Sequence, residues 1–376
     1  MKLALVHDWL NQRGGAEDVL EALNALYPNS PIYTSLYAPD IMPESYRAWD
    51  IRPLWLNSLP AIHTHHQPYL PFYPLAWGGL DLSDYDLILS NKSGFCHGVQ
   101  YGPETLHVCY CLAPTRYVWQ LERYLAREGM SKPVALTLRP LVAALKRWDY
   151  AAAQRVQHFI AISTEIRERI THYYQRESDI IFPPVDTTRF QPAQTVEDYF
   201  LIVSRLIPYK RIDLAVQAAT RLGLPLKIGG SGRDMERLQA MAGPTVEFLG
   251  YVPDEALPDL MARCKAFIFP GLEDFGITPV QAQAAGRPVI AYGGGGALDT
   301  VIPGVTGEHF HELNVESLMA VMSAFDANRY DTRVLRTHAE RFDTALFQRQ
   351  INSFVEQAWE SFSRKRPFVW DNSVVV

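Results

Sequence analysis

Two basic residues, Arg205 and Lys210, lie five positions apart in residues 204–211, which read Ser-Arg-Leu-Ile-Pro-Tyr-Lys-Arg and follow an apolar run. An arginine binds phosphate oxygens through paired N–H donors, and a lysine ammonium acts as a point charge. Ligands of open α/β sheets bind at the carboxyl ends of the strands. The motif therefore predicts a turn that binds a diphosphate, with a basic loop that only faces solvent as the alternative.

The strongest chemical signal is the acidic turn around Glu273, within residues 269–288. Pro279 suits the first turn of a helix, and Gly286 suits its end. Backbone N–H groups at the start of such a helix have no partner within it. We expect these groups to bind sugar hydroxyls or phosphate oxygens, with Glu273 accepting from a hydroxyl beside them. They belong to Phe275, Gly276 and Ile277.

Glycines occupy two further turns between apolar runs and helical patterns. Gly14 and Gly15 form the first turn, and Gly230 lies in the second, Gly-Gly-Ser-Gly at residues 229–232. Glycine lets the backbone approach a ligand, and free N–H groups at a helix start favour an anion. Each turn is a weak signal by itself, because many such turns are rich in glycine for packing.

Histidines are the remaining candidates for chemistry. His97 lies in a loop where it would face a ligand, with a loop histidine of no function as the alternative. His63, His65 and His66 have roughly metal-like spacing, but their segment is aromatic, rich in proline and without acidic companions. We therefore expect no metal there.

Short buried strands have to position these motifs. Ten apolar runs are too short for helices and show little alternation, as is typical of strands buried on both faces. Helical patterns separate them, which predicts an α/β protein with parallel, doubly wound sheets in both halves. The runs are Leu3–Val6, Leu87–Leu89, Val108–Cys111, Phe159–Ile162, Ile180–Phe182, Tyr199–Val203, Leu226–Ile228, Val246–Leu249, Ala266–Phe269 and Val289–Tyr292.

A stretch bracketed by prolines, residues 183–192, separates the two halves, because it continues neither a helix nor a central strand. An ordinary loop is the alternative. We predict an N-terminal domain over residues 1–185, a C-terminal domain over 186–345, and a helix and tail over 346–376.

Composition and charge narrow the classes of function. Lysine and arginine number 35 against 41 aspartates and glutamates, a net charge of −6, which disfavours a nucleic-acid partner. The four cysteines form no Cys-x-x-Cys pair, and no apolar run reaches the roughly 18–20 residues that span a bilayer. The first residues are too short and too polar for a signal peptide. We expect a cytoplasmic protein.

One segment departs from the acidic average. Residues 116–176 hold eleven basic and five acidic residues, a net charge of +6. Aromatic residues interleave with these charges: Tyr117, Trp119, Tyr124 and Trp148. Solvated helix faces are one explanation. The other is a surface for a lipid headgroup or a lipid-linked phosphate, with peripheral contact at the inner face of the cell membrane.

Several motifs together resemble a known family. The sequence Glu-Asp-Phe-Gly-Ile from Glu273, followed by a helix that ends in Ala-Ala-Gly-x-Pro-Val, resembles the signature of retaining glycosyltransferase family 4. Further segments resemble its mannosyltransferase branch, which builds O-antigen and related polysaccharides. They are Val6-His7-Asp8-Trp9, Arg13-Gly14-Gly15, Tyr110-Cys111-x-x-Pro114-x-Arg116-Tyr117-x-Trp119 and the basic motif of residues 204–211.

The resemblance implies the GT-B fold, in which two Rossmann-like domains face each other across a cleft and a C-terminal helix crosses back to the N-terminal domain. A nucleotide-sugar binds in the C-terminal domain, and no metal or other cofactor is needed. Retention in this family is described as front-face attack, with the leaving diphosphate taking the proton of the acceptor hydroxyl.

Matching positions imply roles for individual residues. Arg205 and Lys210 bind the diphosphate, with the Gly14–Gly15 turn closing over it. Glu273 holds a hydroxyl of the transferred hexose, and the N–H groups at Phe275, Gly276 and Ile277 face the same sugar. Gly230 and Val252 contact the nucleoside.

Three positions depart from the family pattern. Gln281 replaces a glutamate that bonds the ribose hydroxyls, and its oxygen accepts without the help of a charge. Leu112 replaces a histidine, whose imidazole His97 would partly replace. Gly294 stands where the branch commonly has an arginine. The departures leave open weakened activity, altered donor choice or loss of catalysis.

We therefore expect a hexosyltransferase that moves mannose from GDP-mannose to a hydroxyl of a growing, lipid-linked glycan. The first alternative is a degenerate GT-B protein that binds nucleotide-sugar or glycan without efficient catalysis. A sugar epimerase or phosphorylase on the same fold is the second.

Overall fold

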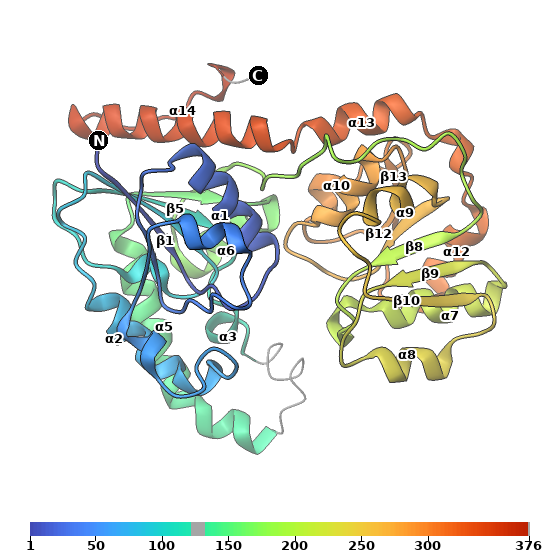
Figure 1. Cartoon of the computed structure of the whole chain (residues 1–376), viewed down its shortest axis with the longest axis horizontal. Coiled ribbons are helices and arrows are strands. Elements are labelled where there is room, and N and C mark those ends of the chain that lie inside the picture. The colour runs from blue at the N-terminus through green and yellow to red at the C-terminus, as the bar shows by residue number, and fades with distance from the viewer. Residues whose placement is uncertain (122–131, 375–376) are drawn as a thin grey trace. The chain divides into compact units, whose positions relative to one another are not determined.

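The computed structural model describes residues 1–121 and 132–374. The chain forms two compact units, one of Met1–Pro184 with Phe347–Val376 and one of Val185–Leu346. Figure 1 shows the elements of both units. The divisions at 184/185 and 346/347 each differ by one residue from those that the sequence predicts.

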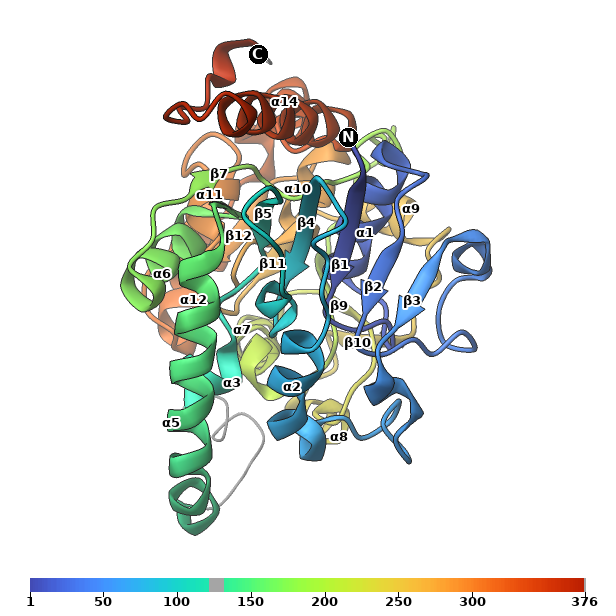
Figure 2. The ribbon, with the colours of Figure 1, turned by 90° about the vertical axis from the view of Figure 1, so that its left-hand side faces the viewer.

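The first unit is built on a parallel sheet of seven strands in the order β3-β2-β1-β4-β5-β6-β7. Figure 2 shows β3, β2, β1, β4 and β5 side by side in this order. Every residue of β1, β4 and β5 is buried, as the apolar runs predict. The strands are β1 (Leu3–His7), β2 (Ile32–Thr34), β3 (Ile51–Pro53), β4 (Leu87–Lys92), β5 (Leu106–Cys111), β6 (His158–Ala161) and β7 (Asp179–Ile180).

Helices connect these strands, and a helix from the C-terminal part of the chain joins them. The side chain of Gln348 donates to the Ala22 carbonyl at 3.0 Å, and the rings of Phe347 and Tyr110 lie 5.5 Å apart. These contacts dock α14 on the first unit. The helices are α1 (Gly15–Leu26), α2 (Tyr73–Gly78), α3 (Arg116–Trp119), α5 (Lys132–Arg155), α6 (Thr164–Tyr174) and α14 (Thr344–Ser363).

The second unit has a parallel sheet of six strands in the order β10-β9-β8-β11-β12-β13. This order reverses beside the first strand in sequence, as in Rossmann-like sheets, and the α/β prediction is confirmed. The strands are β8 (Phe200–Val203), β9 (Leu226–Gly229), β10 (Val246–Gly250), β11 (Ala266–Phe269), β12 (Val289–Tyr292) and β13 (Gly307–Phe310).

Helices cover both faces of this second sheet. Figure 1 shows α7 and α8 on one face and α9, α10 and α13 on the other. Ile202, Ile228 and Ile290 pack in one core with α7 and α12. The helices are α7 (Ile212–Leu222), α8 (Met235–Met241), α9 (Leu257–Arg263), α10 (Ile277–Ala284), α11 (Ala297–Thr300), α12 (Val315–Ala324) and α13 (Thr332–Glu340).

Buried charges fix the loops at the carboxyl ends of β1, β4 and β5. The Asp8 carboxylate accepts from the backbone N–H groups of residues 93–96, at 2.6 to 2.9 Å. Lys92 is fully buried and donates to the Ala113 carbonyl and the Thr115 hydroxyl, both at 3.2 Å. The Asp149 carboxylate accepts from three side chains, those of Thr115, Trp119 and Tyr174.

A buried histidine makes the stability of the first unit depend on pH. Burial is the main cause that lowers the pKa of His107 to about 3, and the nearby Arg155 charge acts in the same direction. In the unfolded chain the His107 ring is protonated below about pH 6.5, whereas in the folded chain it stays neutral down to about pH 3. The folded state therefore loses stability as the pH falls below 6.5. Between pH 7 and pH 5 we expect His107 to remove about 2 kcal/mol from the free energy of unfolding.

Denaturant unfolding at both pH values measures this loss. All eight tryptophans lie in the first unit, so their fluorescence reports on that unit alone. His107→Gln should reduce the difference between the two pH values, and an unchanged difference would contradict the assignment.

Candidate functional site

Most of the predicted site residues lie in loops at the carboxyl ends of neighbouring strands in the second unit. Arg205 and Lys210 follow β8, Gly230 follows β9, and Glu273 follows β11. Because β8 pairs with both β9 and β11, these loops leave the same edge of the sheet side by side.

An ion pair joins two of these loops. The Lys210 ammonium contacts the Glu273 carboxylate, and the two side chains are only 19% and 17% exposed. Partial burial strengthens such a pair relative to one in open solvent. The structure therefore brings together the cation and the carboxylate that the sequence predicts on either side of a sugar diphosphate.

Arg205 lies in the same loop as Lys210, and its side chain is exposed. No ion pair or hydrogen bond joins its guanidinium to any residue in 1–121 or 132–374. Its paired N–H donors are thus available to an anion at this edge of the sheet.

Helix α10 begins beside Glu273, at the position that Pro279 predicts. Gly276 precedes it with φ of 111°, a conformation that favours glycine. Within the described part of the chain, no group accepts from the N–H groups of Gly276, Ile277 and Thr278. Phe275 contributes only its backbone, because its ring is buried and lies 5.6 Å from that of Phe342.

Glycines allow these loops to pack closely. A Cβ on Gly230, whose φ is 126°, would lie 1.9 Å from the Ser204 carbonyl oxygen. A Cβ on Gly296 would lie 2.1 Å from the Cα of Phe275, and the Gly296 N–H donates to the Glu273 carbonyl at 2.9 Å. The glycine run of residues 293–296 therefore packs directly against the backbone of the acidic turn around Glu273.

The three departures from the family pattern have different surroundings. Gln281 is half-buried on α10, and Leu112 is buried after β5 in the first unit. A Cβ on Gly294 would lie 2.7 Å from the ring of Tyr292, which packs 5.7 Å from the ring of Phe310. Only Gln281 and Gly294 belong to the second unit, with Glu273.

Gly14 and Gly15 lie in the first unit, where α1 begins at Gly15. Gly14 is exposed and has an extended backbone. Below this turn, His7 Nε2 lies 3.4 Å from Glu17 Oε1, and both side chains are 2% exposed. The turn is therefore supported by a buried polar pair.

His97 lies in the interior of the first unit and not at a surface where a ligand binds. Its side chain is fully buried, and Nε2 lies 3.3 Å from the Asp149 carbonyl oxygen. Burial lowers the pKa of His97 well below its usual value, so the ring is neutral. The loop faces inward because Asp8 binds the N–H groups of Phe95 and Cys96. His97 therefore does not replace the imidazole missing at Leu112.

The aromatic residues of the basic segment are also used for packing. Tyr117, Trp119 and Trp148 pack against the core of the first unit, and the Trp148 ring lies 5.6 Å from that of Phe95. Tyr124 lies outside the described residues. The three described rings are half-buried and contribute to the packing of the first unit.

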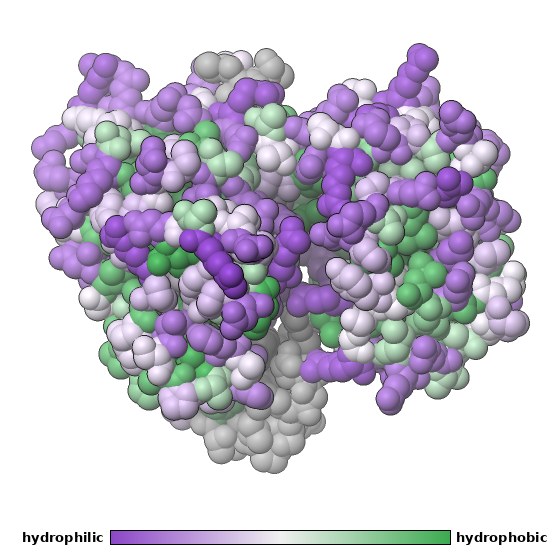
Figure 3. Space-filling view, in the orientation of Figure 1, coloured by the Kyte–Doolittle hydropathy of each residue, from purple (hydrophilic) through white to green (hydrophobic). Residues whose placement is uncertain are grey.

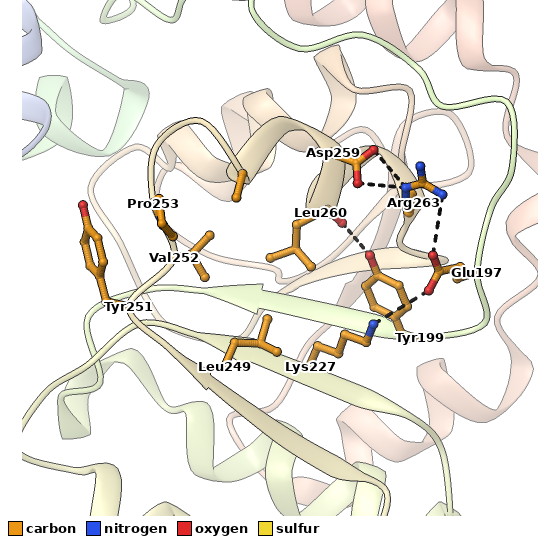
Figure 4. A pocket seen from close by; sticks show the side chains of 11 residues that line it. Glu197, Tyr199, Lys227, Leu249, Tyr251, Val252, Pro253, Asp259, Leu260 and Arg263 are labelled. Carbon is orange, nitrogen blue, oxygen red and sulfur yellow. Dashed lines mark hydrogen bonds and ion pairs between the residues drawn. The ribbon is translucent and has the colours of Figure 1, made fainter.

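A pocket of about 430 Å³ lies between α9 and strands β9 and β10 (Figure 4). Val252 is part of its lining and also lies against Gly229, where a Cβ would approach the Val252 side chain to 2.6 Å. Figure 3 shows hydrophobic and hydrophilic side chains mixed over the face of the second unit that it presents. Apart from Val252, sequence patterns did not predict the pocket, because its lining comes from three distant stretches of the chain, residues 197–199, 227 and 249–263.

Charged side chains join one another at one end of this pocket. Glu197 lies 3.7 Å from Lys227 and 3.8 Å from Arg263, which also binds Asp259 at 2.8 Å. Arg205, Lys210 and Glu273 are not part of the lining. The pocket and the ion pair are therefore separate features of the second unit.

The described residues contain neither a cluster of metal-binding side chains nor a membrane-spanning helix. In residues 1–121 and 132–374, no three His, Cys, Asp or Glu side chains are grouped so as to hold a metal ion. Over the same residues, no helix is long and apolar enough to cross a membrane.

Comparison with known proteins identifies the second unit. Residues 185–341 match the family model described as Glycosyl transferases group 1. A GDP-mannose-dependent alpha-(1-6)-phosphatidylinositol monomannoside mannosyltransferase of Mycolicibacterium smegmatis is 33% identical over 166 residues, covering 36% of this chain and 44% of that protein. A GDP-mannose-dependent alpha-mannosyltransferase of the same organism is 40% identical over 106 residues, or 28% of each chain. The chain spans about half, or less, of the length of these curated relatives.

Solved structures show the same fold over nearly the whole chain. HepE of Anabaena, in complex with UDP, superposes with a TM-score of 0.71 at 17% identity, covering 95% of this chain and 100% of that one. Sucrose-phosphate synthase of Thermosynechococcus elongatus gives 0.67 at 17% identity, with the same coverage. At this identity the likeness establishes the fold alone, which is GT-B.

Proposed function

We propose that the chain, whose second unit matches the Glycosyl transferases group 1 model and whose fold is GT-B, is a retaining hexosyltransferase of family 4. It moves mannose from GDP-mannose to a hydroxyl of a growing, lipid-linked glycan. The observation that carries this proposal is the Lys210–Glu273 ion pair beside the exposed Arg205 and the free N–H groups of α10. The names of the mannosyltransferase relatives support the choice of donor.

In the proposed reaction the protein positions the two substrates and stabilises the negative charge of the leaving diphosphate. Arg205 and Lys210 stabilise the departing diphosphate, and Glu273 and the N–H groups near Gly276 orient the hexose. The leaving diphosphate takes the proton of the acceptor hydroxyl. Because two cationic side chains supply the positive charge, we propose that no metal or other cofactor takes part.

A thermal-shift screen of nucleotide-sugars, followed by product analysis with the best ligand, tests the function. We expect GDP-mannose to raise the unfolding temperature most, and transfer to persist in EDTA. A UDP-sugar as the best ligand would replace the proposed donor. Binding without any product would identify a degenerate binder, a result that the uncharged Gln281 of α10 favours.

The diphosphate assignment predicts the effect of removing each cation. Arg205→Ala and Lys210→Ala should each weaken GDP binding by about 1.5–3 kcal/mol, the range for hydrogen bonds to charged groups. Titration calorimetry with GDP measures the change. Arg221→Ala, which removes an exposed arginine of α7 paired with Glu316, is the matched control. Unchanged affinity for GDP in both Arg205→Ala and Lys210→Ala would show that these residues do not bind the diphosphate.

We further propose peripheral contact with anionic membranes through the basic segment of residues 116–176, whose net charge of +6 supports it. The proposed contact rests on charge, so it should weaken as salt rises. Flotation with anionic and neutral vesicles at low and high salt measures binding. Equal recovery on both kinds of vesicle, or none on either, would leave only solvated helix faces.

A further inference from the structure

The residue after Lys210 has an unusual backbone conformation. Arg211 joins the short turn of residues 208–210 to α7, with φ of 54° and ψ of 34°. In the second unit, which the structure describes throughout, it is the only residue other than glycine with a positive φ. A side chain disfavours this left-handed conformation, so the surrounding contacts must hold it in place.

The Arg211 side chain supplies those contacts. Its Nε donates to Asp213 Oδ1 at 3.1 Å, and a terminal nitrogen donates to Asp213 Oδ2 at 3.3 Å. The other terminal nitrogen donates to the Leu313 carbonyl at 3.4 Å. Arg211 thus ties the start of α7 to the loop between β13 and α12.

Lys210 is held on its other side by close packing. Its N–H donates to the Ile207 carbonyl at 3.0 Å, and its carbonyl oxygen lies 2.9 Å from where a Cβ on Gly271 would be. With its backbone fixed in this way, the direction of the Lys210 side chain depends on the turn at Arg211. That side chain ends at the Glu273 carboxylate.

We propose that Arg211 is a positioning residue for the donor site. Its paired bonds to Asp213 hold the left-handed turn that directs the Lys210 ammonium toward Glu273 and toward a nucleoside diphosphate. Because its guanidinium is bound by Asp213 and Leu313, it acts through Lys210 and not by touching the ligand. This role rests on the proposed function of the same site.

Two substitutions at Arg211 separate the turn from the charge. Arg211→Ala removes the bonds and keeps a Cβ that disfavours the turn, so the dissociation constant for GDP should rise about fivefold. Arg211→Gly removes the same bonds but adopts the turn without strain, and should stay within about twofold of the parent. Arg221→Ala, in the same helix, should change nothing. Equal losses in the alanine and glycine variants would show that the guanidinium itself binds the ligand, and would overturn the proposal.

The Lys210→Ala background gives a second test. If Arg211 acts through Lys210, Arg211→Ala should have no further effect on GDP binding once Lys210 is removed. A loss that persists there would show a general structural role and overturn the proposal. Unchanged GDP binding in Lys210→Ala itself would instead contradict the proposed function of the site.

The effect of Arg211 on the Lys210–Glu273 ion pair can also be measured without ligand, whether or not the protein binds GDP. The coupling between Lys210→Ala and Glu273→Ala in the free energy of unfolding, followed by far-ultraviolet circular dichroism, reports their ion pair. We expect this coupling in the parent and in Arg211→Gly, and its loss in Arg211→Ala. An undiminished coupling in Arg211→Ala would show that the turn does not direct Lys210. The same spectra show whether each variant is folded.

Discussion

Replacing Lys92 by methionine should lower the free energy of unfolding of the first unit by about 3–5 kcal/mol, the loss expected when a buried carboxylate is left without the positive charge that compensates it. Burial by itself lowers the pKa of Lys92, but the Asp149 charge and other neighbouring groups raise it above its usual value. Lys92 is therefore charged in the interior. Methionine would leave the Asp149 carboxylate buried without a nearby cation, and the Ala113 carbonyl without its donor.

Denaturant unfolding followed by tryptophan fluorescence measures this effect in the first unit alone. Lys146→Met is the matched control, since Lys146 is half-buried over the Trp119 ring, 5.4 Å from its centroid. It should cost less than about 1 kcal/mol. Asp149→Asn combined with Lys92→Met should recover part of the loss, because no uncompensated charge remains. A Lys92→Met variant as stable as the control would refute this account.

Glu273→Gln should lower kcat about 100-fold with the identified donor, while donor affinity changes little. The glutamine keeps the shape of the side chain and loses its charge. Positive charge develops at the anomeric carbon during transfer, so a carboxylate beside it stabilises the transition state more than the ground state. Glu273 is mostly buried, and water therefore screens its charge weakly.

Steady-state kinetics of Glu273→Gln and Gln281→Glu distinguish the two roles. If Gln281 accepts from ribose hydroxyls, as the resemblance implies, Gln281→Glu restores the charge to that acceptor and should tighten donor binding by about 1 kcal/mol, or fivefold. A loss confined to KM in Glu273→Gln would place that residue in ground-state binding only. If Gln281→Glu raised turnover from undetectable to robust, the natural protein would be a degenerate binder.

The local apolar pattern predicted ten of the thirteen described strands and missed three short ones, two of which lie at sheet edges. All ten predicted runs overlap strands, because a strand buried on both faces needs several consecutive apolar residues. The missed strands are β2, β3 and β13, of three or four residues each. In β3, Arg52 and Pro53 are exposed, which is typical of an edge strand.

The candidate site shows the same division between local and distant information. The start of α10 and the end of β8 follow from glycine and proline positions near Glu273 and Lys210, so both loops could be predicted. The burial of His97 could not be predicted, because it depends on contacts with Asp8 and Asp149, which are far away in sequence. The left-handed turn at Arg211 was also missed, since its bond to Leu313 crosses 102 positions.

The path of the chain through the two units has a consequence for biosynthesis. The first unit is completed by Phe347–Val376, whereas the second unit is one uninterrupted segment, Val185–Leu346. Ribosomes release the N-terminal part first, and domains generally fold as they emerge. The Tyr110 ring packs against Phe347. This contact cannot form until the whole second unit has been synthesised, because Phe347 follows it in the sequence. The second unit along the sequence is therefore the first that can finish folding, and the nascent first unit needs protection of its uncovered apolar surface for most of the time of synthesis.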